Sequence, residues 1–441
     1  MTSWDQRCLG LEQELFLVDE GGILSNSAEE LLAGCWEAAR SVGKDPACFA
    51  PEVSLSMIEV IVPPARSLAE LSREYLECLK LALEAGRGMG LRLYPLATYP
   101  LPMKPALRDE PRYRMQARTL GEERYLQAGC CTGVHLHLGV HPGAVDPRVG
   151  VSYDAPKEAR KELLDLYNLA TALDPAIVTL GRSSPFYEGL FDGRSPRTLR
   201  YRGHPDFAPD GLLANLQEVG GLLPYATDVE ELVEQQFASY HAWLAAMDRA
   251  GVQQRLFFET GGGLLKASWN PVRLNPKGTV ELRAIDGNYP HTVLALAALV
   301  SAAADRVRRE GLIVVPREGL KTFEAADNAL YVPSFEYLSG ELFRAAVTQG
   351  LESSEIVSYL DSVVRFAATG AGQAEESGLE ALTTSGSYRT TEAEILKSLP
   401  SPVSPLLQEE GLRIVREACN ELEEQVASLG QRFWSKETST R

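Results

Sequence analysis

Residues 9–20 read LGLEQELFLVDE, an apolar run that carries two glutamates two positions apart. In a β-strand, successive side chains point to opposite faces of the sheet. Glu12 and Glu14 therefore share one face with Phe16, while Leu11 and Leu15 point to the other. Neighbours on the same face lie about 6.5 Å apart, so two buried carboxylates repel each other unless a cation compensates them. The segment predicts either a strand with a cation beside it or a strand with one face in solvent.

An apolar face opposite a polar face recurs in two further segments. In CTGVHLHLGV, His135 and His137 alternate with valine and leucine, a pattern shared by zinc sites and by inert strands. In GTVELRAID, Glu281 and Arg283 share a face with Ile285, opposite an apolar face. Both segments favour half-buried strands whose polar side carries chemistry or meets solvent.

A fourth segment, PEVSLSMIEVIVPP, places Glu59 within a β-branched run and Glu52 seven residues before it. Neither carboxylate belongs in a strand core without a partner. One antiparallel sheet with an apolar back satisfies all four segments. Its front would carry Glu12, Glu14, Glu59, His135 and Glu281.

Such a group of carboxylates is too rich in oxygen ligands for a structural zinc site and suits Mg²⁺ or Mn²⁺. Because Mg²⁺ commonly bridges carboxylates to phosphate oxygens, it suggests a nucleoside triphosphate as substrate. The chain has no GxxxxGK[ST] motif, so a P-loop is excluded. The stretch ETGGGLLKAS offers backbone amides and Lys266 for phosphates, although a plain turn explains its glycines equally well.

Three arginines lie close to these acids in the sequence. Arg273 and Arg283 flank Glu281, and Arg112 occurs in EPRYRM. Arginine binds carboxylates and phosphates through two hydrogen bonds at once, so each is a candidate for holding an acidic substrate or the γ-phosphate. A structural ion pair is the alternative for each.

Composition limits the partners and the location. The 441 residues carry 43 basic and 60 acidic side chains, a net charge of −17, which argues against nucleic acid or an anionic membrane as partner. The start lacks the features of a signal peptide, and the longest apolar run, 292–304, is too short to span a membrane. Seven cysteines without regular spacing indicate reduced thiols in a cytoplasmic protein.

The pattern along the chain predicts a mixed α+β protein without βαβ alternation. We expect strands at 8–18, 57–62, 91–96, 132–140, 256–258 and 280–285. We expect helices at 28–42, 67–86, 156–173, 228–250, 291–309, 337–349 and 407–429. The segments 142–153, 183–211 and 367–404 are expected to be loops; the last is either a lid or a disordered insertion. The region from about 320 onward is expected to be helical.

Taken in order, GLEQELFLVDE, PEVSLSMIEV, CTGVHLHLGV, SSPFYEG and RLNPKGTVELRAID resemble the glutamate–cysteine ligase type 2 family, which includes bacterial carboxylate–amine ligases. The resemblance implies a glutamine-synthetase-like fold, a curved antiparallel sheet forming a funnel flanked by helices. It also implies a single catalytic domain over 1–441, with the core motifs in 9–290 and a mainly helical part from about 320.

The resemblance further implies roles for individual residues. Arg283 is similar to the arginine that stabilises the transferring phosphoryl group. From the residues themselves and not from the resemblance, we expect Arg273 to be catalytic and Lys266 and Arg112 to bind the nucleotide. His137 falls in the same motif but ranks below His135. The residues that resemble the ligands of the Mg²⁺ or Mn²⁺ are Glu12, Glu14, Glu52, Glu59, His135 and Glu281.

The implied reaction uses ATP to phosphorylate glutamate or a similar carboxylic acid. An amine such as cysteine then attacks the acyl phosphate. The chain departs from the family's GCHVHVG pattern, because GCCTGVHLHLGV inserts Thr132 and Gly133 between the cysteines and the histidines. The acceptor amine is therefore open.

Two other functions stay open from the sequence. A metal-dependent hydrolase would use His135, His137 and the carboxylates, and would act without nucleotide. A catalytically silent relative would bind only nucleotide or a partner, although such a protein need not keep so many carboxylates that destabilise it. A homo-oligomer is compatible with either function and with the ligase.

Overall fold

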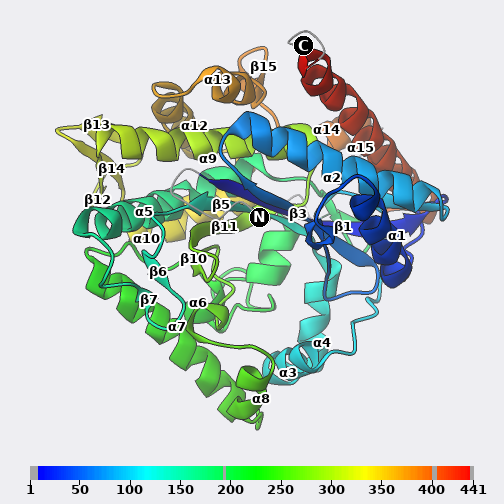
Figure 1. Cartoon of the computed structure of the whole chain (residues 1–441), viewed down its shortest axis with the longest axis horizontal. Helices are drawn as coiled ribbons and strands as arrows, with labels where there is room; N and C mark the ends of the chain where they lie inside the picture. The colour runs from blue at the N-terminus through cyan, green and yellow to red at the C-terminus, as the bar shows by residue number, and fades with distance from the viewer. Residues whose placement is uncertain (1–7, 192–194, 400–404, 438–441) are drawn as a thin grey trace.

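An antiparallel sheet of seven strands forms the centre of the computed structural model, which describes residues 8–191, 195–399 and 405–437. The strand order is β10-β11-β5-β1-β3-β2, and β4 pairs with β1 beyond the end of β5. The α+β class expected from the sequence is confirmed (Figure 1). The strands of this sheet are β1 (Leu9–Asp19), β2 (Phe49–Pro51), β3 (Met57–Ala65), β4 (Leu91–Tyr94), β5 (Gly133–Gly139), β10 (Val272–Asn275) and β11 (Thr279–Asp286).

Helices cover the apolar face of the sheet. Leu11, Leu15, Leu136 and Leu282 alternate with the polar residues of their strands and are at most 3% exposed. The hydrophobic effect drives this face against α1 (Ala28–Ser41), α2 (Leu68–Arg87), α5 (Lys157–Leu180) and α9 (Pro290–Glu310). The helix α5 is long and apolar enough to cross a membrane, but it is almost wholly buried in the fold, as a core helix is.

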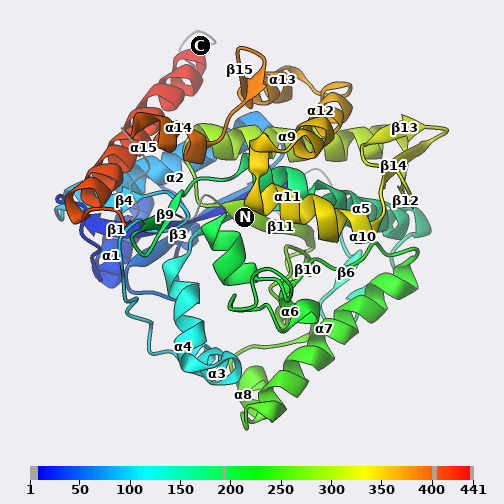
Figure 2. The ribbon, with the colours of Figure 1, turned by 180° about the vertical axis from the view of Figure 1, so that it is seen from behind.

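The opposite face of the sheet is divided into two parts. At one end, Phe16, Val18 and Met57 pack against Ile414 and Val415 of the C-terminal helix α15 (Gln408–Glu437). The remaining part, which carries the charged residues, faces α3 (Pro111–Leu120), α4 (Glu122–Tyr125), α6 (Gln217–Gly220), α7 (Val229–Arg249) and α8 (Gln254–Glu259). Figures 1 and 2 show these helices on the side of the sheet away from α2 and α9.

The long helices lie where the sequence predicts them, and several short elements do not. Residues 256–258, expected as a strand, belong to α8. An apolar triplet is too short to reveal its period; Phe257 is buried against Met115 and Trp243, while Phe258 is 48% exposed. The strand β10 was not expected.

Each of the three expected loops contains regular structure. The segment 142–153 holds β6 (Val145–Asp146) and β7 (Gly150–Val151). The segment 183–211 holds β8 (Phe186–Tyr187), β9 (Leu190–Phe191) and a π-helical turn, Thr198–Arg202. The segment 367–404 holds α13 (Gln373–Glu380), β15 (Thr383–Thr384), β16 (Ser387–Tyr388) and α14 (Thr391–Ser398). Residues 192–194 and 400–404 lie outside the described residues.

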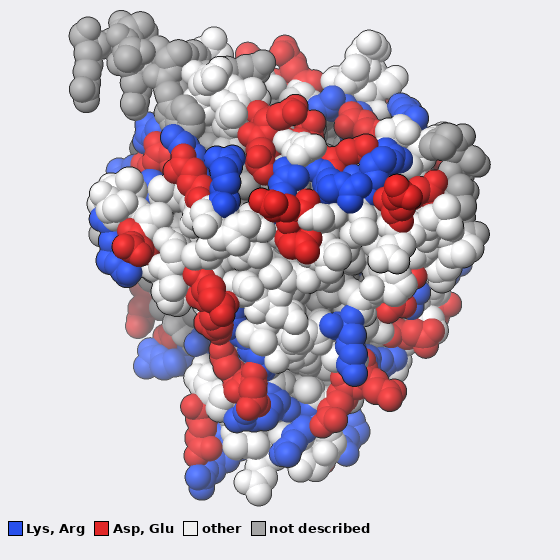
Figure 3. All heavy atoms as spheres, turned by 90° about the vertical axis from the view of Figure 1, so that its right-hand side faces the viewer, with Lys and Arg blue, Asp and Glu red and all other residues white. Residues whose placement is uncertain are grey.

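The region after α9 is not wholly helical, which corrects the expectation for residues from about 320 onward. A small sheet of β12 (Ile313–Arg317), β14 (Ala329–Pro333) and β13 (Glu324–Ala326) precedes the helices. The helices α10 (Phe335–Tyr337), α11 (Phe343–Thr348) and α12 (Ser354–Ala368) follow it. On the face shown in Figure 3, acidic and basic side chains are interspersed around uncharged surface.

One buried polar side chain lies on the apolar face of β1. The Gln13 side chain, 0% exposed, donates from Nε2 to the carbonyl oxygen of Asn288 at 2.8 Å and accepts from the hydroxyl of Tyr75. It thus joins β1 to the segment after β11 and to α2. Because both partners are buried, the pairing fixes the position of β1.

We expect Gln13→Leu to lower the free energy of unfolding by about 1–3 kcal/mol, because it leaves the Tyr75 hydroxyl and the Asn288 carbonyl without partners. Urea unfolding followed by circular dichroism measures the change. Gln373, exposed on α13, provides a matched control, and Gln373→Leu should stay within about 0.5 kcal/mol of wild type. Equal stability of the two variants would contradict the role assigned to Gln13.

Candidate functional site

The strand register brings the charged residues of β1, β3 and β5 together. Glu12 lies opposite His135 of β5, and Glu14 lies opposite Glu59 of β3. His135 Nδ1 is 3.2 Å from one oxygen of Glu12, and its Nε2 is 3.8 Å from an oxygen of Glu14. The two glutamates of LGLEQELFLVDE therefore face the same imidazole.

A second group forms where β11 lies between β5 and β10. Glu281 lies opposite both His137 and Arg273, and its side chain is fully buried. Arg273 Nε donates to Glu281 at 2.7 Å, and Arg283 donates to the other oxygen of the same carboxylate. Two guanidinium groups on one carboxylate leave an excess of positive charge at this edge.

Glu52 joins the group from the turn after β2 and not from a strand of its own. Ligand atoms of Glu14, Glu52 and Glu59 lie within 4.8 Å of one another. The same holds for Glu12, Glu59 and His135, and for Glu12, His137 and Glu281. All six residues that the sequence predicts as metal ligands thus lie together, with His137 beside them. Their binding of metal stays a prediction.

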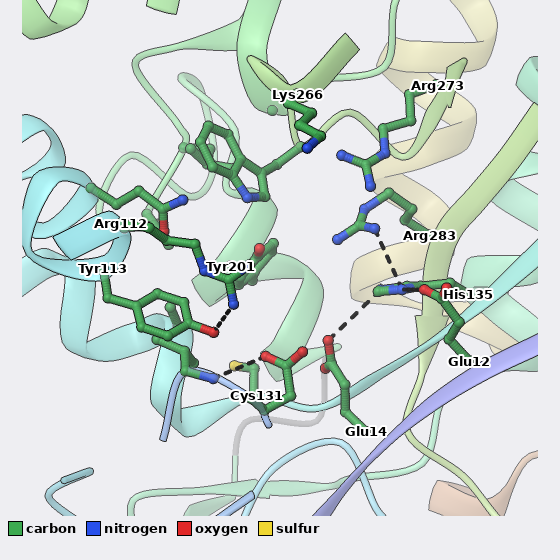
Figure 4. A pocket seen from close by; sticks show the side chains of 18 of the residues that line it. Glu12, Glu14, Arg112, Tyr113, Cys131, His135, Tyr201, Lys266, Arg273 and Arg283 are labelled. Carbon is green, nitrogen blue, oxygen red and sulfur yellow. Dashed lines mark hydrogen bonds and ion pairs between the residues drawn. The ribbon is translucent and has the colours of Figure 1, made fainter. Parts of the chain in front are cut away.

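Five of these residues line a cavity of about 630 Å³, namely Glu12, Glu14, Glu52, Glu59 and His135. Figure 4 shows Glu12, Glu14 and His135 on one side, with Arg273 and Arg283 above His135 and Lys266 beside them. Arg112 also lines the cavity and donates to the hydroxyl of Tyr113. The expected arginines and lysine therefore face the same space as the carboxylates. Lys266 Nζ donates to the carbonyl of Gly261 at 2.9 Å, within the glycine-rich segment.

Glu14 and Glu59 are poorly compensated by protein charges, and burial raises the pKa of Glu52 as well. Burial, together with the charge of Glu52, raises the pKa of Glu14 to about 8. Burial and the charge of Glu12 raise the pKa of Glu59 well above its usual value. Both groups therefore favour the protonated form unless positive charge is added.

Glu12, Glu281 and His135 are each held in one charge state. Burial alone would raise the pKa of Glu12, but hydrogen bonds with His135 and His137 hold it well below its usual value. Burial likewise opposes ionisation of Glu281, which Arg273 and Arg283 nevertheless keep charged. Burial and the charge of Arg283 lower the pKa of His135 to about 4, so its imidazole is neutral near pH 7, the form that binds metal.

The chemistry of these donors fits a hard divalent cation. Five carboxylates supply oxygen ligands, which Mg²⁺ and Mn²⁺ prefer, and a neutral imidazole supplies one nitrogen. The raised pKa values of Glu14 and Glu59 mark the place where positive charge is lacking.

Several residues of the cavity were not identified from the sequence. Lys277 Nζ lies 2.6 Å from Glu12, and the Asn275 amide donates to Glu281 at 2.6 Å. Both occur in RLNPKGTVELR, where the turn between β10 and β11 places them over the acids; recognising that hairpin would have found them. Arg197 and Tyr201 come from the π-helical turn and its preceding residue, for which the sequence carries no comparable signal.

The Thr-Gly insertion before the histidines has a structural explanation. The backbone N–H of Gly133 donates to Glu14 at 2.7 Å. A Cβ at this position would lie 2.1 Å from Arg197 Nη2, so a larger residue would displace the guanidinium from its present position. Arg197 in turn donates to the carbonyl oxygen of Arg283 at 3.2 Å. The insertion therefore admits a further arginine to the cavity.

Without divalent metal, we expect the stability of the protein to fall as the pH rises from about 4.5 to about 8. Glu14 has a pKa of about 8 in the folded state against a usual value of 4.5, so the folded state binds more protons in this range. Mg²⁺ or Mn²⁺ should replace these protons and raise the melting temperature more at pH 8 than at pH 6. At 100 times the dissociation constant, the gain is about 2.7 kcal/mol.

Differential scanning calorimetry at constant ionic strength measures both effects. Glu14→Gln serves as the comparison, and its decline between pH 6 and pH 8 should be smaller. A metal effect that is absent, or that is larger at pH 6, would contradict the charge balance described for the cavity.

Comparison with known proteins relates the chain to one family. Residues 8–340 match the family described as Glutamate-cysteine ligase family 2. A Streptomyces coelicolor protein, provisionally named glutamate–cysteine ligase 2, is 24% identical over 88% of this chain and 94% of its own length. A similarly named Rubrobacter xylanophilus protein is 29% identical over 68% of this chain and 71% of its own. A Streptomyces avermitilis relative is 27% identical, but the match spans only 44% of that protein.

Solved structures share the fold. A glutamate–cysteine ligase from Francisella tularensis, in complex with AMP, has a TM-score of 0.56 and 13% identity, covering 100% of this chain and 95% of its own. A bifunctional glutathione synthetase from Pasteurella multocida has a TM-score of 0.52 and 14% identity, covering 95% of this chain and 52% of its own. At these identities the likeness concerns the fold, and it confirms the glutamine-synthetase-like architecture expected from the sequence.

Proposed function

The chain belongs to glutamate-cysteine ligase family 2, and with that membership as premise we propose that it is an ATP-dependent carboxylate–amine ligase. The observation that carries the proposal is a single cavity with metal-type carboxylates on one side and fixed cations on the other. That combination suits transfer of a phosphoryl group from ATP to an acid. We further propose glutamate or a similar acid as the acceptor of the phosphoryl group and an amine such as cysteine as the nucleophile.

The carboxylates and His135 would hold Mg²⁺ or Mn²⁺, through Glu12, Glu14, Glu52, Glu59, His135 and Glu281. When bound, the metal would neutralise negative charge on the phosphates of ATP. Lys277 Nζ lies 2.6 Å from a carboxylate oxygen of Glu12 and supplies positive charge there. Because its side chain is 46% exposed, it has room to move as other cations arrive.

Arg283 is the strongest candidate for stabilising the transferring phosphoryl group. Its contacts with Glu281 and the 3.4 Å approach to His135 Nδ1 fix the guanidinium beside the expected metal ligands. Although burial opposes its charge, Glu281 raises the pKa of Arg283, so it stays cationic throughout the reaction. Arg273 shares the same carboxylate and is anchored on the Ser268 carbonyl at 2.9 Å. Fixed cations stabilise developing charge without reorganisation.

The ends of the cavity suit different parts of the substrates. Met115, Phe257, Leu265 and Trp269 provide an apolar and aromatic wall that suits a nucleobase. Lys266 and Gly261 beside it would meet phosphate oxygens. The proposed nucleotide would then lie between the aromatic wall and the carboxylates.

Arg197 and Arg112 suit an acidic substrate. Arg197 is 7% exposed, lines the cavity and makes no ion pair with any residue that the structure describes. Arg112 lines the same cavity, and within the described chain its side chain bonds to the Tyr113 hydroxyl and to no carboxylate. A carboxylate that does not react would satisfy these guanidinium groups, which favours an acid with a second carboxylate.

The proposed reaction has two steps. The substrate carboxylate attacks the γ-phosphorus of ATP, which gives an acyl phosphate and releases ADP. The amine then attacks the acyl carbon, the amide bond forms, and inorganic phosphate leaves. No enzyme nucleophile is needed, so positioning and electrostatics supply the catalysis. The proposal includes small molecules as the binding partners and a cytoplasmic location for the protein.

Incubation of the protein with ATP, Mg²⁺, glutamate and a panel of amines tests the function. We expect phosphate release that depends on both the acid and the amine, with the matching amide identified by mass spectrometry. An arm without nucleotide tests the alternative of a hydrolase. Phosphate release that no amine increases, across several carboxylic acids, would exclude the ligase.

We expect Glu12→Gln and Glu281→Gln to lower kcat by about 100-fold or more, because each removes a charge that organises the metal or Arg283. Glu234, exposed on α7, supplies the control, and Glu234→Gln should keep wild-type activity. Circular dichroism checks that the variants fold. Full activity of either site variant would show that the metal assignment is wrong.

A further inference from the structure

A second, smaller hollow lies away from the cavity, between the start of α9 and the helices α14 and α15. It measures about 290 Å³ and shares no lining residue with the cavity described above. Figure 2 shows α14 beside α15 at this place. The residues that border it include Tyr289, Glu394, Ile395, Glu417 and Glu421.

Three carboxylates border the hollow, and one of them lacks a cation. Glu394 pairs with Arg389 at 3.3 Å, and Glu417 pairs with Arg413 at 2.7 Å. Glu421 makes no ion pair with the part of the chain that the structure describes. The hollow therefore keeps one negative charge that no neighbouring side chain neutralises.

The Glu421 carboxylate is nevertheless held in position. Gln425 Nε2 donates to it at 2.7 Å. The side-chain oxygen Oε1 of Gln425 in turn accepts from the backbone N–H of His291 at 3.0 Å and from its Nδ1 at 2.8 Å. Burial lowers the pKa of His291, so this ring is neutral near pH 7 and does not compensate Glu421. Gln425, which His291 holds, therefore positions one oxygen of the Glu421 carboxylate.

Tyr289 provides an observation independent of the acids. The residue is 7% exposed and lines the hollow, where the charges of Glu421, Glu394 and Glu417 act on its hydroxyl. Among the described residues, nothing hydrogen-bonds to that hydroxyl. A hydroxyl that borders the hollow and has no protein partner among these residues is available to bond a ligand atom.

The chemistry of the hollow selects an organic cation over a metal ion. Ile395, Ile414 and Ala418 give it an apolar floor. Because two of the three carboxylates already pair with arginines, too few free oxygen ligands remain for a divalent ion. An ammonium group on a small apolar body matches one free carboxylate, one hydroxyl and an apolar floor.

We propose that this hollow is a binding site for a small protonated monoamine. The ammonium group lies between the Glu421 carboxylate and the Tyr289 hydroxyl, and the apolar body rests on Ile395, Ile414 and Ala418. The proposal is independent of the ligase reaction, because it uses none of the residues assigned to catalysis.

Isothermal titration calorimetry with benzylamine tests the site on the full chain. Benzyl alcohol is the neutral counterpart of the same shape. We expect saturable binding of benzylamine and none of benzyl alcohol. Glu421→Gln and Tyr289→Phe should each weaken binding about tenfold or more, the loss expected for a hydrogen bond to a charged group. Glu424, exposed on the same helix, gives the control Glu424→Gln, which should bind as wild type does.

Three results would overturn the proposal. These are no saturable binding by the wild-type protein, equal binding of benzyl alcohol, and undiminished binding of benzylamine to Glu421→Gln. The last result would place the amine elsewhere, including the larger cavity. Because Glu421 is exposed, its variant is expected to fold, so it decides the question even if thermal unfolding shows that Tyr289→Phe is damaged.

Discussion

The structure depends on how one face of a sheet accommodates five carboxylates. At the β10 edge the protein itself compensates the carboxylate charge, since Glu281 forms ion pairs with two arginines and stays ionised. Further along the sheet, Glu14 and Glu59 have no such partners, and burial raises the pKa of both. The face therefore runs from a surplus of positive charge to a deficit. A triphosphate with its metal carries both signs and matches that gradient.

The rest of the fold keeps this face accessible but shielded. Large helices bury the apolar back of the sheet, so β1, β5 and β11 are held rigidly from behind. On the front, α15 covers the apolar end of β1, while α3, α8 and the π-helical turn wall the charged part. One face of β1 thus packs in the core. On its other face, one end packs against α15 and the rest lines the cavity.

Alternation along a strand is local, so the sequence was enough to predict β1, β3, β5 and β11 and to assign Glu12, Glu14 and Glu281 to a polar face. Register is not local, and the opposition of Glu14 and Glu59 required the structure. Arg197 and Lys277 were missed because turns and loops have no period to expose them. The strand expected at 256–258 was wrong for a related reason, since three apolar residues fit a helix or a strand equally well. The pattern of elements indicated the α+β class, and the resemblance of the ordered motifs added the glutamine-synthetase-like architecture.

The hydrogen bonds of Gln13 have a consequence for how such a sequence can evolve. Its amide satisfies Tyr75 on one side and the backbone at Asn288 on the other, and Asn288 also accepts from Thr391 at 2.6 Å. A single substitution at position 13 is unfavourable, because it leaves the Tyr75 hydroxyl and the Asn288 carbonyl, both far away in the chain, without hydrogen-bond partners. Across related proteins, we therefore expect substitutions to occur together at positions 13, 75, 288 and 391. The residue between the two glutamates is thus constrained by the packing of the fold, although it lies on the face of β1 away from the cavity.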